Sequence, residues 1–108
     1  MPAKSFPKWY NFLKKEHGAF LDAVEGLGEA VRKTGPLDEK TSQLIQMAAA
    51  AASRSEGSTH SHARRALQAG ATPGEIFHAI ILLTSTIGFP NTSAALSWVH
   101  DVVGEKKG

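Results

Sequence analysis

The four residues 72–75, Thr-Pro-Gly-Glu, carry the strongest local signal in this sequence. Threonine is a preferred N-cap, proline is tolerated in the first helical turn, and a glutamate three residues after the cap closes a capping box. Residues 76–83, which follow at once, are almost all apolar. The pattern predicts a helix that begins at Pro73, is apolar around most of its circumference and stops near residues 88–90.

Helical spacing continues along the rest of the chain, and no strand alternation of useful length appears. Pro7 is expected to open a first helix, which Gly18 interrupts. Asp38 is a suitable N-cap for a helix that runs through the five alanines 48–52. Between these two segments, apolar residues recur on one helical face at Phe20, Val24, Leu27 and Val31. The sequence predicts one all-α domain over residues 1–108, with about six helices.

Two more helices complete the predicted pattern. The pattern breaks at residues 55–58, so we expect the next helix to span residues 59–69, with Gly70 as its C′ residue. Asn91 or Thr92 is expected to cap the last helix. Because so much of the apolar surface is helical, we expect the chain to bury it in a homo-oligomer or in the centre of a compact bundle.

Composition excludes several classes of function. The formal net charge is only +2, and the basic residues are scattered, so we expect no nucleic-acid partner. No apolar run approaches the roughly 20 residues that a membrane span requires. The N-terminus lacks an apolar signal-peptide core, which favours a cytoplasmic location. Cysteine is absent, which removes disulfides, thiolate nucleophiles and thiolate metal sites.

Three segments together resemble a known family. They are "LDEKTSQLIQMAAAAA", the pattern H-x-R-x-A-L-x-A-G-A-T-P-x-E-I that starts at His62, and "GFPNTSAAL". They are similar to the carboxymuconolactone decarboxylase-like family, which includes the alkylhydroperoxidase D-type proteins. The resemblance is strongest over residues 37–103. It implies an all-helical bundle of the alkylhydroperoxidase D-like type, a small-molecule substrate and assembly as a homo-oligomer, commonly a trimer or hexamer.

The peroxidase branch of this family carries Cys-x-x-Cys-x-x-x-His. Aligned on His62, the two cysteine positions are occupied by Ser55 and Ser58, and the glutamate upstream of them by Gln43. A serine hydroxyl cannot pass through sulfenic acid or disulfide states. The resemblance therefore implies the scaffold and its histidine, while the missing cysteines exclude the thiol peroxidase mechanism.

The decarboxylase branch keeps the histidine without cysteines and has an acidic residue six positions before it, as Glu56 stands before His62. The resemblance implies a possible lyase without cofactor, in which His62 is the general acid that protonates carbon after loss of CO₂. Glu56 would set the tautomer or charge of the imidazole. Ser58, one helical turn before His62, would support the ring.

Simpler interpretations of these residues stay open. His62 can be an ordinary polar helix position, and Ser58 can do no more than hydrogen-bond it. Glu56 can stabilise the helix dipole and pair with His60, which follows it by four residues. Arg64 points about 200° away from His62 on a helix, so it reaches the same site only across a subunit interface.

No metal site is expected. His60 and His62 lie on different faces of a helix, so a metal held by Glu56 and these two would need a non-helical segment or a third ligand from elsewhere. The alternative to a lyase is a catalytically silent oligomeric scaffold or small-ligand binder that has lost the Cys-x-x-Cys site.

Overall fold

The computed structural model describes residues 8–107, with side chains to Gly104, and contains no strand within these residues. The seven helices are α1 (Lys8–Glu16), α2 (Gly18–Arg32), α3 (Glu39–Ala52), α4 (Glu56–Gln68), α5 (Pro73–Ile81), α6 (Thr84–Ile87) and α7 (Phe89–Lys107). Six have nine residues or more, and α6 has four, so the all-α prediction is confirmed. None of these helices is long and apolar enough to cross a membrane.

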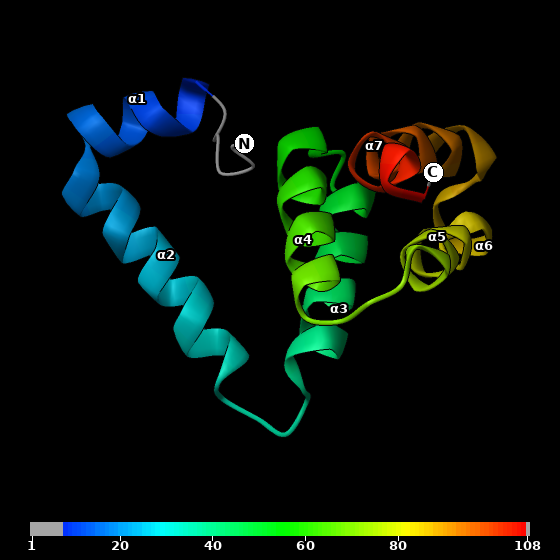
Figure 1. Cartoon of the computed structure of the whole chain (residues 1–108), viewed down its shortest axis with the longest axis horizontal. Coiled ribbons are helices and arrows are strands. Elements are labelled where there is room, and N and C mark those ends of the chain that lie inside the picture. Colours follow the sequence, from blue (N-terminus) through cyan, green and yellow to red (C-terminus); the bar gives the residue numbers. More distant parts are fainter. Residues whose placement is uncertain (1–7, 108) are drawn as a thin grey trace. The chain divides into compact units, whose positions relative to one another are not determined.

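Two compact units divide the chain after Pro36 (Figure 1). The first contains α1 and α2, which meet at His17, one residue before the predicted interruption at Gly18. The hydroxyl of Tyr10 donates to Glu25 across this pair, at 2.9 Å. The predicted stripe of Phe20, Val24, Leu27 and Val31 lies on α2 with all four side chains exposed. Pro7, the expected start of α1, lies outside the described residues.

The second unit begins with a tight pair of helices. Asp38 accepts a hydrogen bond from the backbone N–H of Thr41 at 2.8 Å, which confirms it as the N-cap of α3. α3 ends in a Schellman turn: the N–H groups of Arg54 and Ser55 donate to Ala51 and Ala50, and Arg54 adopts a φ of 65°. The turn reverses the chain within three residues, so α4 returns antiparallel to α3 (Figure 1).

The predicted start of α4 near Thr59 is wrong. α4 begins at Glu56, because the Ser55 side chain accepts a hydrogen bond from the backbone N–H of Ser58 and so caps the helix three residues earlier. Its C-terminus is as predicted. Gly70 adopts a φ of 102° and donates to Leu67, as a C′ glycine does.

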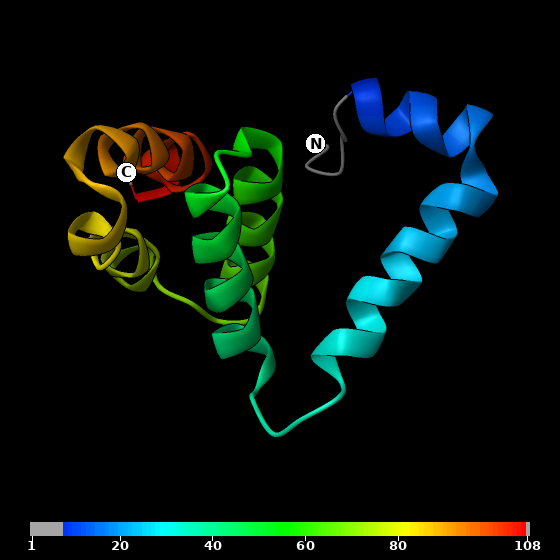
Figure 2. The ribbon, with the colours of Figure 1, turned by 180° about the vertical axis from the view of Figure 1, so that it is seen from behind.

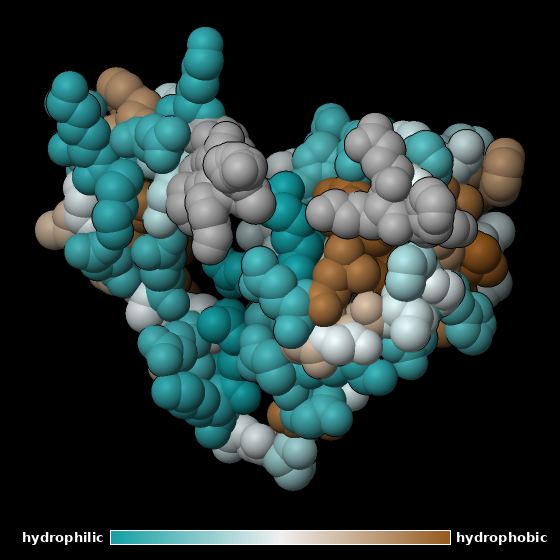
Figure 3. All heavy atoms as spheres, in the orientation of Figure 1, coloured by the Kyte–Doolittle hydropathy of each residue, from teal (hydrophilic) through white to brown (hydrophobic). Residues whose placement is uncertain are grey.

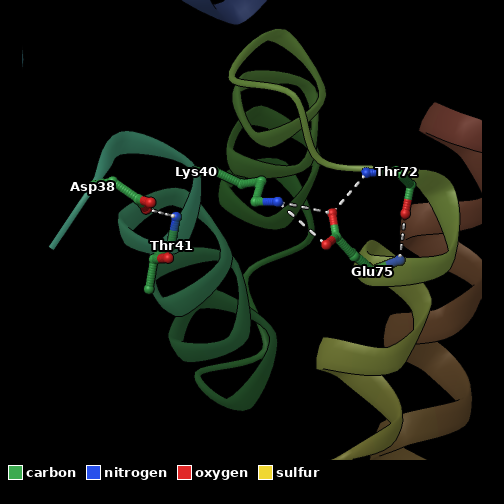
Figure 4. A network of polar contacts seen from close by, with 5 residues as sticks. All are labelled: Asp38, Lys40, Thr41, Thr72 and Glu75. Atoms are coloured by element: carbon green, nitrogen blue, oxygen red, sulfur yellow. Dashed lines mark hydrogen bonds and ion pairs between the residues drawn. The ribbon is translucent and has the colours of Figure 1, made fainter.

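The capping box before α5 is confirmed, and it also connects two helices. Thr72 and Glu75 exchange backbone-to-side-chain hydrogen bonds, both 3.0 Å long. The Glu75 carboxylate also accepts from the ammonium of Lys40, at 3.2 and 3.3 Å. Figure 4 shows how this glutamate joins the first turn of α5 to the first turn of α3.

The region after α5 differs from the prediction. α5 ends at Ile81, where Thr84 donates its hydroxyl to the Ile81 carbonyl, and α6 is a separate short helix. Gly88, at a φ of 88°, then redirects the chain, and α7 begins at Phe89. Asn91 therefore lies inside α7 and donates to the carbonyl of Ile87, so the predicted capping by Asn91 or Thr92 is wrong.

The core of the second unit lies where α3, α4, α5 and α7 meet. Figures 1 and 2 show α3 and α4 side by side, with α5 and α7 running across them. Five of the ten core residues are alanine, which lets the helix backbones approach closely. The core comprises Met47, Ala51, Ala63, Ala66, Ala71, Ile76, Ile80, Ala95, Val99 and Val103.

Candidate active site at the α3–α4 interface

His62 lies on the side of α4 that faces α3. Its Nδ1 atom is 2.7 Å from Oε1 of Gln43, a residue of α3. Gln43 is fully buried, and the imidazole is half-buried. A buried amide must be hydrogen-bonded to offset its loss of water, so this contact anchors the ring against the helix pair.

Gln43 is itself oriented by a second partner. Its amide nitrogen donates to Oε2 of Glu39, one turn earlier on α3, at 2.7 Å. A carboxylate can only accept, so the amide nitrogen has to face Glu39 and the amide oxygen has to face His62. An amide oxygen also only accepts, and Nδ1 of His62 must therefore carry a proton and donate it.

This chain of contacts assigns the tautomer of the neutral imidazole. With the proton on Nδ1, the atom that takes up and returns a proton is Nε2. The amide of Gln43 does not itself exchange protons near neutral pH, so Glu39 orients the ring through Gln43 and does not relay protons to it. The geometry gives His62 a defined acid–base atom.

Of the predicted site residues His62, Glu56 and Ser58, the first two have different partners in the structure. The fold brings His62 together with Gln43 and Glu39, whereas Glu56 lies beside His60, 3.8 Å from its Nε2 atom. The pairing of Glu56 with His60 is the one that their spacing predicted. Ser58 is half-buried, and its backbone N–H donates to the Ser55 side chain. The roles of Glu56 and Ser58 as supports for His62 stay predictions.

In the sequence, Gln43 stands out only as the replacement for a glutamate, and Glu39 was not predicted as a site residue. One signal was available: Glu39 and Gln43 are four residues apart, so they share a face of the predicted helix. The family resemblance placed Gln43 at the position of the glutamate that serves the histidine in the peroxidase branch, but nothing in the sequence predicted its direct contact with His62, 19 residues further along the chain. Arg64, the other residue considered for this site, is exposed.

The fold and the site define the protein as a cysteine-free helical bundle with an anchored histidine between two antiparallel helices. The sequence model of the carboxymuconolactone decarboxylase family matches residues 18–101. The chain belongs to this family. The match covers parts of both compact units, and the single domain expected over residues 1–108 stays a prediction.

A solved structure supports the same assignment. The chain is similar to a carboxymuconolactone decarboxylase family protein from Legionella pneumophila, whose crystal structure is of the apo form. The TM-score is 0.77 at 25% sequence identity, and the alignment covers 93% of this chain and 88% of the other. A comparison with curated proteins gave no match.

Proposed function

We propose that this protein is a cofactor-free lyase that removes CO₂ from a small carboxylated, enolisable molecule, with His62 as the general acid–base group. The observation that carries the proposal is the 2.7 Å contact between Nδ1 of His62 and Oε1 of Gln43. Family membership supports the class of reaction, and the contact supports the residue.

The chemistry requires a proton at carbon. When the C–C bond to the carboxylate breaks, its electron pair enters a conjugated carbonyl group and forms an enolate, and CO₂ leaves. Protonated Nε2 of His62 would then give its proton to carbon, and water would restore it. An imidazole titrates near neutral pH, so it can carry out both steps, and such a group typically contributes about 10²–10⁴-fold to the rate.

Gln43 and Glu39 act on this reaction as positioning residues. The carbonyl of Gln43 accepts from Nδ1 whether the ring is neutral or protonated, so the ring keeps one orientation through the cycle. Glu39 holds the amide in the only orientation that leaves the oxygen toward His62. Ser58, one turn before His62 on α4, is retained in the proposal as a support for the ring. Glu56 is given no role in the reaction, because its carboxylate contacts His60.

The proposal includes assembly as a homo-oligomer, a trimer or hexamer as in the family resemblance. Large apolar side chains stay exposed on α5, after its end and at the start of α7: Ile81, Leu82 and Phe89 are 50%, 63% and 65% exposed. Figure 3 shows further apolar side chains at the surface of the second unit. Exposed apolar patches of this kind mark contact surfaces.

The test is decarboxylation of unsaturated lactone carboxylates by the purified chain, with release of CO₂ as the readout. His62→Ala should lower turnover by about 10²–10⁴-fold without changing the helicity measured by circular dichroism. Gln43→Leu should lower kcat by at least about tenfold, equivalent to about 1.4 kcal/mol, because the ring loses its fixed tautomer.

A second readout separates positioning from a merely structural role. In ¹⁵N NMR spectra of the imidazoles, His62 of the wild type should show the Nδ1–H tautomer, and Gln43→Leu should shift it toward Nε2–H. His78→Ala, on the exposed side of α5, is the control for both measurements. Turnover that survives His62→Ala would contradict the proposal, and binding without turnover by the wild type would favour a small-ligand binder.

A further inference from the structure

A second cluster of side chains lies on the outer side of α4. His60 stands between two carboxylates: its Nε2 atom is 3.2 Å from Oδ2 of Asp101 and 3.8 Å from Oε2 of Glu56. One ligand atom from each of the three residues lies within 4.8 Å of the other two. A metal site at Glu56 and His60 needs a third ligand from another part of the chain, and Asp101 of α7 lies in the position to be that ligand.

We propose that Glu56, His60 and Asp101 form a binding site for a divalent transition-metal ion of the Zn²⁺ type. The donor set is one imidazole nitrogen and two carboxylate oxygens, which are ordinary zinc ligands. Two ionised carboxylates with a neutral imidazole carry a charge of −2, which balances the charge of the ion. The site is chemically separate from His62, which points about 200° away from His60 around α4.

Two of the three donor separations are at or close to those of ligands on one ion, and the Glu56 and Asp101 oxygens lie within 4.8 Å of each other. Zinc–nitrogen and zinc–oxygen bonds are about 2.0–2.2 Å long, so the ligand atoms of one tetrahedral or octahedral ion lie about 3.0–3.5 Å apart. The 3.2 Å separation of His60 and Asp101 already falls in that range. The 3.8 Å separation of His60 and Glu56 closes to it with a shift of about half an ångström, which a half-exposed glutamate side chain makes by a small rotation about its own bonds.

The scaffold below the cluster holds two of the ligands in place. His60 and Asp101 lie on different helices, 41 residues apart in the sequence. α4 and α7 pack against each other, and the fully buried Ala63 and Val99 are one turn or less from the two ligands. His60 is the least exposed of the three, at 24% of its side chain, against 57% for Glu56 and 59% for Asp101. A bound ion would clamp α4 to α7.

Isothermal titration of the full chain with ZnCl₂ at neutral pH, in a buffer that does not bind zinc, tests the site. The expected result is one ion per chain with a dissociation constant in the micromolar range. His60→Ala and Asp101→Asn should each weaken binding by at least about tenfold. Zn²⁺ should also raise the Tm of the wild type and leave that of His60→Ala unchanged, because it binds the folded chain only.

His78→Ala and His100→Ala, which remove exposed histidines outside the cluster, are the matched controls and should bind as the wild type does. Asp101→Asn replaces one carboxylate oxygen by an NH₂ group, which removes the negative charge and keeps the shape of the side chain. Because Asp101 is exposed, this variant tests the site even if His60→Ala destabilises the fold. Binding that is absent, or equal in His60→Ala and wild type, would overturn the proposal. Binding lost in a control variant instead would show adventitious capture by another histidine.

Discussion

Gln43 is buried between two polar partners, and both atoms of its amide are committed. The Glu39 carboxylate fixes the orientation of the Gln43 amide, and the amide oxygen in turn fixes the orientation of the His62 imidazole. A second residue with an unusual local state is Arg54, at the C-terminus of α3. It adopts the left-handed conformation that glycine normally fills at the C′ position of a Schellman turn.

Arg54→Gly should stabilise the fold. The left-handed backbone costs a residue with a Cβ roughly 1–2 kcal/mol, and glycine would remove this cost. Part of the resulting gain in stability is offset, because glycine has more conformational freedom in the unfolded chain. We expect a net gain of about 1 kcal/mol, measured as a Tm rise of about 4–8 °C. Arg54→Ala, which removes the guanidinium but keeps the Cβ, is the control; an equal gain there would mean that the charge and not the backbone is responsible.

At the scale of helices, Glu75 serves two elements at once. Its carboxylate completes the capping box of α5 and receives the ammonium of Lys40 from α3 (Figure 4). The backbone N–H of Thr72, and after it the Lys40 ammonium, hold the pKa of Glu75 below its ordinary 4.5. Hydrogen bonds from the side chain and backbone of Thr41 likewise keep the pKa of Asp38 below 3.8.

The stabilising effect of Glu75 should depend on pH in a defined direction. Because its pKa is lower in the folded than in the unfolded chain, its contribution is present above pH 4.5 and disappears as the pH falls through the folded-state pKa. The Tm of the wild type should therefore exceed that of Glu75→Gln at about pH 6, and the difference should shrink as the pH falls below 4.5. Glutamine keeps the capping geometry, so the comparison isolates the charge.

Lys40→Met should lower the Tm at about pH 6 by less than Glu75→Gln does, because it leaves the contact between Thr72 and the Glu75 carboxylate in place. The two substitutions should not add, because they remove one shared ion pair. A Tm difference between wild type and Glu75→Gln that is constant over the whole pH range would contradict this account of the network.

At the scale of the whole molecule, the second unit has a small core rich in alanine and an apolar outer surface at Ile81, Leu82 and Phe89. Small side chains allow close helix packing but bury little area each, so such a unit gains little hydrophobic stabilisation alone. Association of several copies would bury the exposed residues.

Light scattering after size exclusion should give a mass that is a multiple of the 11.5 kDa chain, three or six times. Leu82→Glu should reduce the mass toward that of one chain while circular dichroism keeps the helical signal, because a charge in an apolar interface is desolvated without a partner. Ser85→Glu, an exposed position on the neighbouring α6, is the control and should assemble normally. A wild type that elutes as a monomer would refute the assembly.

Helix ends could be predicted from the sequence, whereas contacts between helices could not. Asp38, Gly70 and Thr72 end or begin helices where predicted, because a cap involves backbone groups within four residues. The start of α4 was misplaced because Ser55 and Gly57 resemble a loop, although one serine cap satisfies the first turn. The family resemblance singled out His62 and aligned Gln43 with the upstream glutamate of the same site, but it did not predict the hydrogen bond between them.

The amino-acid order by itself determined an all-helical chain, most of its helix ends and the impossibility of thiol chemistry, since each depends on residue identity or on neighbours along the chain. Only the tertiary structure decided that His62 meets Gln43 and that Asp101 approaches His60. These contacts join residues 19 and 41 positions apart, and they arise from the packing of α3 and α7 against α4, which no local pattern encodes.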